Sequence, residues 1–238
     1  MKKIHILLYI IVINSQQLLA QDSLHFGTDY YVSGYMKAVS EYASLYSGNC
    51  QQSLEFRVID HQYFKEQHYV IGKLFYNGIL YPDVLLRWDL YRDELIVLSP
   101  AGSNIVLINE NTGFAEIHGY HIFYHHPDGS TGCPSAGYYL LLHSGKYRLL
   151  EKISYSPNVA KIEGKRLTYT FLVSSFFYLQ KDEVYHKINS QRKLLKTLGT
   201  HRKEMKSLIQ SNGYKYKRNA EEMALELVKE HEKLSRYE

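Results

Sequence analysis

The chain is poor in the residues and motifs that usually identify an enzyme from its sequence. It contains only two cysteines, Cys50 and Cys133, and no stretch with a specific catalytic, cofactor-binding or nucleic-acid-binding signature. No Gly-x-Ser-x-Gly elbow occurs, and no Ser-x-x-Lys motif is placed near a residue that could act as the general base for its serine. We therefore predict no cofactor and no nucleic-acid partner. The two cysteines could form one disulfide if the compartment is oxidising.

Apolar runs long enough to cross a membrane are also lacking. Residues 4–13 form an apolar run of ten residues that would span about 15 Å as a helix, roughly half the hydrocarbon core of a bilayer. Lys2 and Lys3 precede this run, and Ala20 is a small residue suited to a signal-peptidase cut. We expect residues 1–20 to be a secretory signal peptide. The mature chain is then exported, to the periplasm or out of the cell, with no transmembrane segment.

Tyrosine is the residue that is over-represented, with 23 in 238 residues. A tyrosine ring fills a half-buried face of a sheet while its hydroxyl stays in water, so this composition favours a β-rich protein with an aromatic surface. The hydrophobic content of 45% and charged content of 22% are those of an ordinary globular protein. We expect one main domain.

Hydrophobic alternation predicts short antiparallel strands. Val84, Leu86, Trp88 and Leu90 alternate with more polar residues, which places them on one inward face. Turn residues separate many short apolar segments with no helix between them, so we expect an antiparallel meander that forms a sandwich, a curled sheet or a small barrel. The expected strands are residues 54–59, 69–75, 84–90, 94–98, 104–108, 114–118, 120–124, 138–142, 147–153, 169–179 and 184–188.

Helical patterns flank this sheet. Residues 30–46 predict a short helix, and from Ser190 the apolar spacing is helical again. Ser190 and Thr200 are expected N-caps, Gly199 ends the first of the two helices, and Asn219 with Glu222 resembles a capping box that opens the last helix. The predicted class is α+β, with a β domain over residues 21–188 and a basic helical cluster over residues 189–238 packed on the sheet.

Three stretches resemble a family of exported proteins of the Bacteroidota. They are FYNGILYPDVLLRWDLYRDELIVL at residues 75–98, HGYHIF at 118–123 with GYYLLLHSGKYRLLEK at 137–152, and YHKINSQRKLLKTL at 185–198. The leader ending in Ala20 and Gln21 is also similar to leaders of that group. The family has no established biochemical activity, so the resemblance implies export and a shared fold and assigns no catalytic residue.

Four histidines within nine residues form the richest candidate for a metal site: His118, His121, His125 and His126. Neutral imidazole is a common ligand of zinc and copper. In a strand, however, His121 and His125 share one face while His118 and His126 share the other, so one ion could not gather three of them without a bend. We predict solvent-facing histidines and no metal.

Other candidates for catalysis are weaker. Cys133 with His125 or His126 could form a thiolate pair, but a disulfide with Cys50 or an inert thiol is the simpler interpretation. Asp89 and Asp93 crowd one hairpin with further acidic and basic residues, which is typical of turns and cross-strand ion pairs.

The basic segment gives the best indication of a binding function. Residues 181–218 contain eleven Lys or Arg and three acidic residues, a net charge of plus eight, whereas residues 21–180 carry a net charge of minus three. Six cations in this segment, Arg192 among them, recur at helical spacing beside a leucine stripe, and five of the six are predicted to bind anions. These five are Lys193, Lys196, Arg202, Lys203 and Lys206.

These observations together predict an exported, non-enzymatic interaction protein of the envelope or the extracellular space. Its expected partner is anionic envelope lipid, lipopolysaccharide or glycan, or another envelope protein. Two alternatives stay open. One is a carrier that holds a lipid or glycan in an apolar cavity behind Trp88, and the other is a metal-dependent or thiol hydrolase that uses the region from His118 to Cys133.

Overall fold

The computed structural model describes residues 44–163 and 166–236. The signal peptide predicted at residues 1–20 lies outside the described residues, as does most of the helix predicted at residues 30–46. The chain divides into two compact units, residues 1–47 and residues 48–238. In the first unit, the described residues are 44–47, and they contain the 3-10 turn η1, Ser44–Tyr46.

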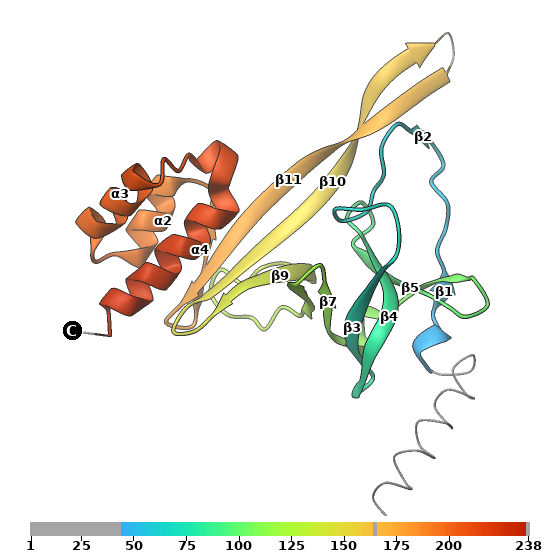
Figure 1. Cartoon of the computed structure of the whole chain (residues 1–238), viewed down its shortest axis with the longest axis horizontal. Coiled ribbons are helices and arrows are strands. Elements are labelled where there is room, and N and C mark those ends of the chain that lie inside the picture. The colour runs from blue at the N-terminus through green and yellow to red at the C-terminus, as the bar shows by residue number, and fades with distance from the viewer. Residues whose placement is uncertain (1–43, 164–165, 237–238) are drawn as a thin grey trace, which may run out of the picture. The chain divides into compact units, whose positions relative to one another are not determined.

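The second unit is built on one mostly antiparallel sheet, followed by three helices (Figure 1). The sheet order is β1-β6-β5-β4-β3-β7-β8-β9-β10-β11-β12, and β2 pairs with β11 in parallel. The path is open and uncurled, and its end strands β1 and β12 do not pair with each other, so the described strands do not close into a small barrel, and a sandwich of two sheets is not seen either. The strands are β1 Asn49–Cys50, β2 Arg57–Val58, β3 Val70–Tyr76, β4 Ile79–Asp89, β5 Glu94–Leu98, β6 Asn104–Val106, β7 Thr112–Ile117, β8 Tyr120–His125, β9 Gly137–Ser144, β10 Arg148–Glu163, β11 Arg166–Lys181 and β12 Val184–Ile188.

Tight turns with positive φ join several neighbouring strands. Asn77 and Gly78 have φ of 52° and 77°, the backbone of the two-residue hairpin turns that match strand twist. The inward face predicted for β4 is confirmed, because Val84, Leu86 and Trp88 are buried. Local turn chemistry and period-two patterning therefore place most of the sheet correctly.

Trp88 lies at the centre of this part of the core. Its ring is 1% exposed and lies 5.4 Å from the ring of Phe64 and 6.5 Å from that of Tyr138. The space behind Trp88, where a carrier would need a cavity, therefore contains aromatic side chains.

Several predicted elements have different lengths in the structure. The strand expected at residues 54–59 is reduced to the two residues of β2, and the one expected at 104–108 ends at Val106. The opposite error concerns β10 and β11, which were expected at 147–153 and 169–179 but each extend over 16 residues. Their distal parts contain Ser, Pro, Asn, Lys and Thr, whose β-propensity is mixed, and the pairing of the two strands with each other overrides that preference.

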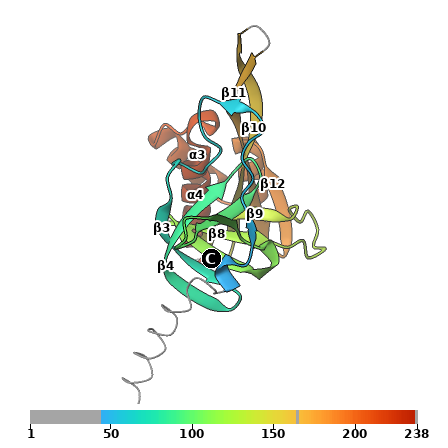
Figure 2. The same ribbon diagram turned by 90° about the vertical axis from the view of Figure 1, so that its right-hand side faces the viewer.

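The three helices pack on one side of the base of the strand pair β10 and β11 (Figure 1 and Figure 2). They are α2 Gln191–Leu198, α3 Arg202–Ser211 and α4 Tyr216–Leu234. Buried residues of all three helices, such as Leu194, Met205 and Leu227, form one cluster with Leu149 and Phe177 of the hairpin. The apolar stripe read from the sequence therefore packs on the sheet.

Two of the predicted helix caps behave differently from expectation. Thr200 does not cap α3: His201 is the residue before the helix, and the Thr200 hydroxyl instead lies 3.0 Å from Nε2 of the buried His231. Asn219 does not begin α4, which starts at Tyr216, but its non-helical backbone (φ −132°, ψ 39°) interrupts the helix at the predicted place. The sequence thus identified the break in α4 at Asn219 and missed the helical turn of α4 that precedes it.

Candidate functional site

The first wall of the candidate site is helix α2. The Ser190 hydroxyl accepts a hydrogen bond from the Lys193 backbone N–H at 3.2 Å, which caps the helix as predicted, and Gly199 ends it with φ of 88°. Leu194 and Leu198 are buried against the sheet. Since side chains four residues apart lie on one side of a helix, Arg192 and Lys196 project together from the exposed face of α2.

Helix α3 and the start of α4 form the other walls. Met205 and Ile209 anchor α3 in the core, which leaves Arg202 and Lys206 exposed and again four residues apart. The Tyr216 hydroxyl at the start of α4 donates a hydrogen bond to the carbonyl of Ile188 at 2.9 Å. This bond ties the start of α4 to the end of β12 and fixes one rim of the space between the helices.

A groove of about 860 Å³ lies between these three elements. Five of its ten lining residues are cationic and none is acidic. Among the described residues, none of these five cations has a carboxylate partner within 4.0 Å. We call this space the basic groove. Its lining residues are Asn189, Ser190, Gln191, Arg192, Leu195, Lys196, Arg202, Lys206, Tyr216 and Lys217.

The structure separates the five cations that the sequence grouped together. Lys196, Arg202 and Lys206 line the basic groove. Lys203 points to the other side of α3, where it lines a second hollow with Glu204 and Glu230. Lys193 is exposed on α2 and lines neither space.

Two groove cations were missing from the predicted set, Arg192 and Lys217. The sequence pattern places Arg192 at helical spacing to Lys196, but the predicted anion-binding set left it out. Lys217 could not have been added from spacing, because it enters the groove only through the way α4 starts beside α2 and α3.

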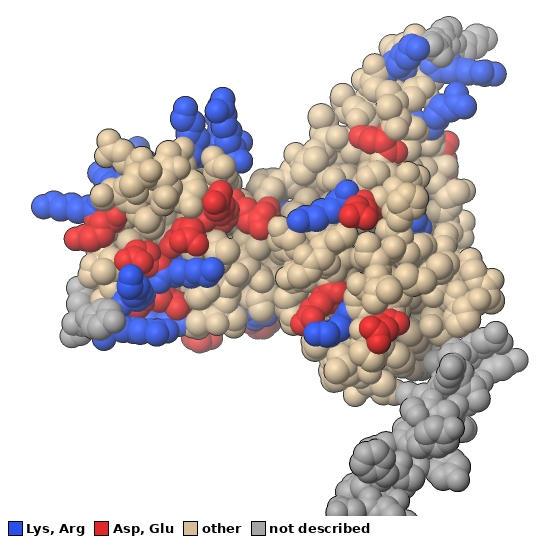
Figure 3. All heavy atoms as spheres, in the orientation of Figure 1, with Lys and Arg blue, Asp and Glu red and all other residues tan. Residues whose placement is uncertain are grey.

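Charge is unevenly distributed over the helices. Acidic side chains lie across the face of the helical region shown in Figure 3, and basic side chains project from its edges. The acidic residues belong mainly to α4, which contains Glu221, Glu222, Glu226 and Glu230. The positive charge of the basic groove is therefore confined to α2 and the N-terminal parts of α3 and α4.

The four clustered histidines lie in four different environments. His118 lies in the β7–β8 turn with φ of 53°, and the His121 ring stacks on Phe114 at 4.8 Å. His125 is buried against aromatic rings, so the solvent-facing position predicted for it is wrong, whereas His126 is exposed as predicted. Among the described residues, no group of three or more His, Cys, Asp or Glu side chains is arranged to hold a metal.

The two cysteines are not joined to each other, so the disulfide considered for Cys50 and Cys133 is absent from the structure. Cys50 is exposed in β1. Cys133 lies in the β8–β9 loop, where its Sγ is 3.2 Å from Nε2 of His125.

The contact between Cys133 and His125 is one that the sequence proposed. Burial lowers the pKa of His125, which disfavours the imidazolium that would stabilise a thiolate. The pKa of Asp128 is lowered to about 2, chiefly by hydrogen bonds from Ser130 and also by one from the Cys133 side chain. These bonds fold the loop around the thiol, which matches a structural role better than a nucleophilic one.

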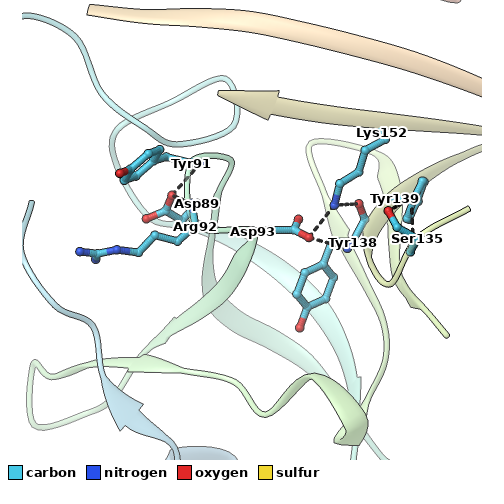
Figure 4. A network of polar contacts seen from close by, with 8 residues as sticks. All are labelled: Asp89, Tyr91, Arg92, Asp93, Ser135, Tyr138, Tyr139 and Lys152. Carbon is cyan, nitrogen blue, oxygen red and sulfur yellow. Dashed lines mark hydrogen bonds and ion pairs between the residues drawn. The ribbon is translucent and has the colours of Figure 1, made fainter. Parts of the chain in front are cut away.

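A further polar network joins the β4–β5 turn to β9 and β10 (Figure 4). The Asp93 carboxylate accepts hydrogen bonds from Lys152 Nζ at 2.5 Å and from the Tyr138 N–H at 3.2 Å. Lys152 also donates to the Tyr138 carbonyl at 3.0 Å, and Asp89 accepts the N–H groups of Tyr91 and Arg92 at 2.9 Å. The turn role predicted for the aspartates is thus confirmed, and Lys152 is a partner that the sequence did not reveal.

Lys152 is 16% exposed, and its burial lowers its pKa while Asp93 opposes that shift. A Cβ at Gly137 would lie 2.5 Å from both Asp93 Oδ2 and Lys152 Nζ, so a larger residue there would displace the ion pair. The ion pair therefore links the β4–β5 turn to β10, and its two residues are 59 positions apart in the chain.

Comparison of the chain with protein-family models, with curated proteins and with solved structures found no match. Within the described residues, none of the helices is both long enough and apolar enough to cross a membrane.

Proposed function

We propose that the protein is an exported, non-enzymatic interaction protein that binds an anionic group in the basic groove. The observation that carries this proposal is the lining of the groove, with five cations and no acid. Two of the cations are arginines, whose planar guanidinium forks match phosphate and carboxylate oxygens in pairs. Acidic glycans and the phosphorylated headgroups of envelope glycolipids carry these groups.

The charged side chains that line the groove favour a ligand with anionic groups. Leu195, Tyr216 and the methylene stems of the long side chains add apolar contact beside those charges. A carrier with its ligand behind Trp88 is less well supported, because the rings of Phe64 and Tyr138 pack there. A thiol hydrolase has the contact between Cys133 and His125 in its favour, but the lowered pKa of that histidine opposes it.

A charge-matched pair of variants tests the groove. The first replaces Lys196, Arg202 and Lys206 by glutamine, and the control replaces Lys193, Lys203 and Lys229, three exposed lysines that do not line the groove. The probes are a soluble acidic oligosaccharide and inorganic tripolyphosphate, measured by titration calorimetry at low and high salt. Neither probe contains an apolar phase, so binding reports on the groove alone.

We expect the groove variant to lose at least about tenfold in affinity, since each lost cation removes up to about 1 kcal/mol near an anionic partner. The control should change affinity far less, and binding should weaken with salt because the screening length falls from about 10 Å at 0.1 M to about 3 Å at 1 M. Equal losses in both variants would mean that binding follows net charge only, and absent binding to both probes would refute the proposal.

A further inference from the structure

The distal half of the β10–β11 hairpin projects beyond the rest of the sheet (Figure 1). Strand β10 pairs with β9 only through residues 148–151, and β11 pairs with β12 only through residues 177–181. Beyond these points the two strands pair mainly with each other, and β11 also meets the short strand β2 at Thr168 and Tyr169. The nine residues 155–163 alone would extend for about 30 Å.

The register of the hairpin makes its projecting half amphipathic. Directly opposite residues share a face, and the pairs Tyr155 with Val173 and Ile162 with Leu167 belong to the apolar face. The other face carries polar pairs such as Ser154 with Ser174 and Asn158 with Thr170, together with one exposed leucine, Leu172. The sequence thus places two apolar or aromatic rows along one side of an element that stands out from the core.

Part of this apolar face is covered and part is open to solvent. Phe171 is 7% exposed, because the rings of Phe56 and Tyr91 pack near it. In contrast, Ile162 is 67% and Val173 63% exposed. Exposed aliphatic side chains at these positions add nothing to the core, so folding does not explain them.

The free edge of β10 is unsuited to adding another strand. The N–H of Tyr155 leaves the hairpin and bonds to the Leu90 carbonyl at 3.0 Å, so alternate residues of β10 direct their N–H groups outward. Pro157 occupies the next such position and has no N–H to offer. The docking surface is therefore the apolar face, and a strand pairing at the edge is disfavoured.

The charge of the tip indicates what covers that face. Residues 155–173 contain three basic residues and one acidic residue. Arg57 of β2 lies beside this segment, and basic side chains gather near the distal end of the hairpin in Figure 3, with acidic ones nearer its base. Exposed aliphatic residues combined with tyrosine rings and a cationic surround are the features of elements that lie in the interface of an anionic bilayer.

We propose that the distal β10–β11 hairpin is a membrane-docking arm that buries its apolar face in the interfacial layer of an anionic lipid bilayer. The cations at the tip bind lipid phosphates, and Val159, Ile162, Leu167 and Val173 enter the headgroup and acyl boundary. This inference is independent of the basic groove, since it rests on another element and on apolar contact.

Vesicle flotation of the purified full chain tests the arm. The arm variant replaces Val159, Ile162 and Val173 by serine. The matched control replaces Ile71, Leu80 and Leu85 by serine, three exposed aliphatic residues of β3 and β4. Vesicles of phosphatidylcholine alone and vesicles with added phosphatidylglycerol separate the apolar contribution from the charged one.

We expect the arm variant to bind anionic vesicles at least about tenfold more weakly than the unmodified protein, while the control retains its binding. Replacing Lys161 and Arg166 by glutamine should weaken binding to the anionic vesicles only. Thermal melts confirm that each variant is folded, as expected for exposed positions.

Equal losses in arm and control variants would overturn the proposal. So would a lack of vesicle binding by the unmodified protein, and a protein partner would then be the occupant to seek. The groove variant should keep its vesicle docking through the arm, which separates the two proposals.

Discussion

The two ends of the β10–β11 hairpin are made of similar residues in opposite environments. Near the base, Leu149 and Leu179 are fully buried, whereas Ile162 and Val173 in the distal half are more than 60% exposed. Both ends contain apolar rows at the same period of two. The comparison shows that the neighbours of a strand decide whether its apolar residues stabilise the fold or are available for binding.

The base is buried because it has a layer on each face. On one side, α2, α3 and α4 pack on Leu149 and Phe177. On the other side, Leu150 belongs to a second cluster with Phe123 and Tyr139. The distal half has no comparable second layer among the described residues, so its apolar side chains keep much of their contact with water.

The largest expected effect is on the stability of the base. Phe177→Ala should lower the free energy of unfolding by about 3–5 kcal/mol, through lost burial and the cavity left behind. Val173→Ala, four residues earlier on the same strand and face, should change it by less than about 0.5 kcal/mol. Denaturant melts of both variants measure the difference. Similar losses would show that the distal half is part of the cooperative core.

A buried carboxyl at the base gives a smaller, pH-dependent effect. Glu151 is 4% exposed, and burial raises its pKa from 4.5 to about 7, while the Ser175 hydroxyl donates to it and Glu221 of α4 adds like charge. Below pH 4.5 the carboxyl is protonated whether the chain is folded or unfolded, so its burial then has little cost. As the pH rises from about 4.5 to about 7, the unfolded chain releases this proton first, and the folded state loses stability.

Glu151→Gln should therefore raise the free energy of unfolding at pH 8, by about 1–3 kcal/mol, and leave it nearly unchanged at pH 4. Glu110→Gln, at an exposed position of the 3-10 turn Asn109–Asn111, is the control and should show no such pH dependence. Stability curves from pH 4 to pH 8 make the comparison. A Glu151→Gln variant that is less stable than the unmodified protein at pH 8 but not at pH 4 would contradict this, because it would mean that the ionised carboxylate stabilises the fold.

The smallest of these effects concerns the helix that covers the base. Ser190→Ala removes the hydroxyl that caps α2 and should cost about 1 kcal/mol. Ser207→Ala, at an exposed site inside α3, should be neutral or slightly stabilising because alanine is the better helix former there. Thermal melts of the two variants distinguish a capping effect from a general effect of losing serine.

Much of the fold could be read from local patterns. The alternation around Trp88, the turn at Asn77 and Gly78, and the cap at Ser190 each depend on residues near in sequence, and the structure confirms them. The errors concern elements whose extent depends on distant partners. Residues 154–163 and 166–168 become strand because the two halves of the hairpin pair with each other.

The candidate site was read less completely for the same reason. Helical spacing identified Lys196, Arg202 and Lys206 as cations with a shared environment, but it also grouped Lys203 with them, which the structure places on the other side of α3. Helical spacing predicts which residues share a face of one helix, but it does not predict which face packs against a neighbouring helix.

The sequence by itself determined the β-rich class, the position of most strands and turns, the helical C-terminus and the concentration of positive charge there. These features follow from periodicity, backbone preference and composition, which act over a few residues. The tertiary structure alone decided that Lys217 joins Arg192 in one groove, that Lys152 pairs with Asp93, and that only the base of the long hairpin is covered. Each of these depends on how segments far apart in the chain pack together, because burial and charge pairing are properties of neighbours in space.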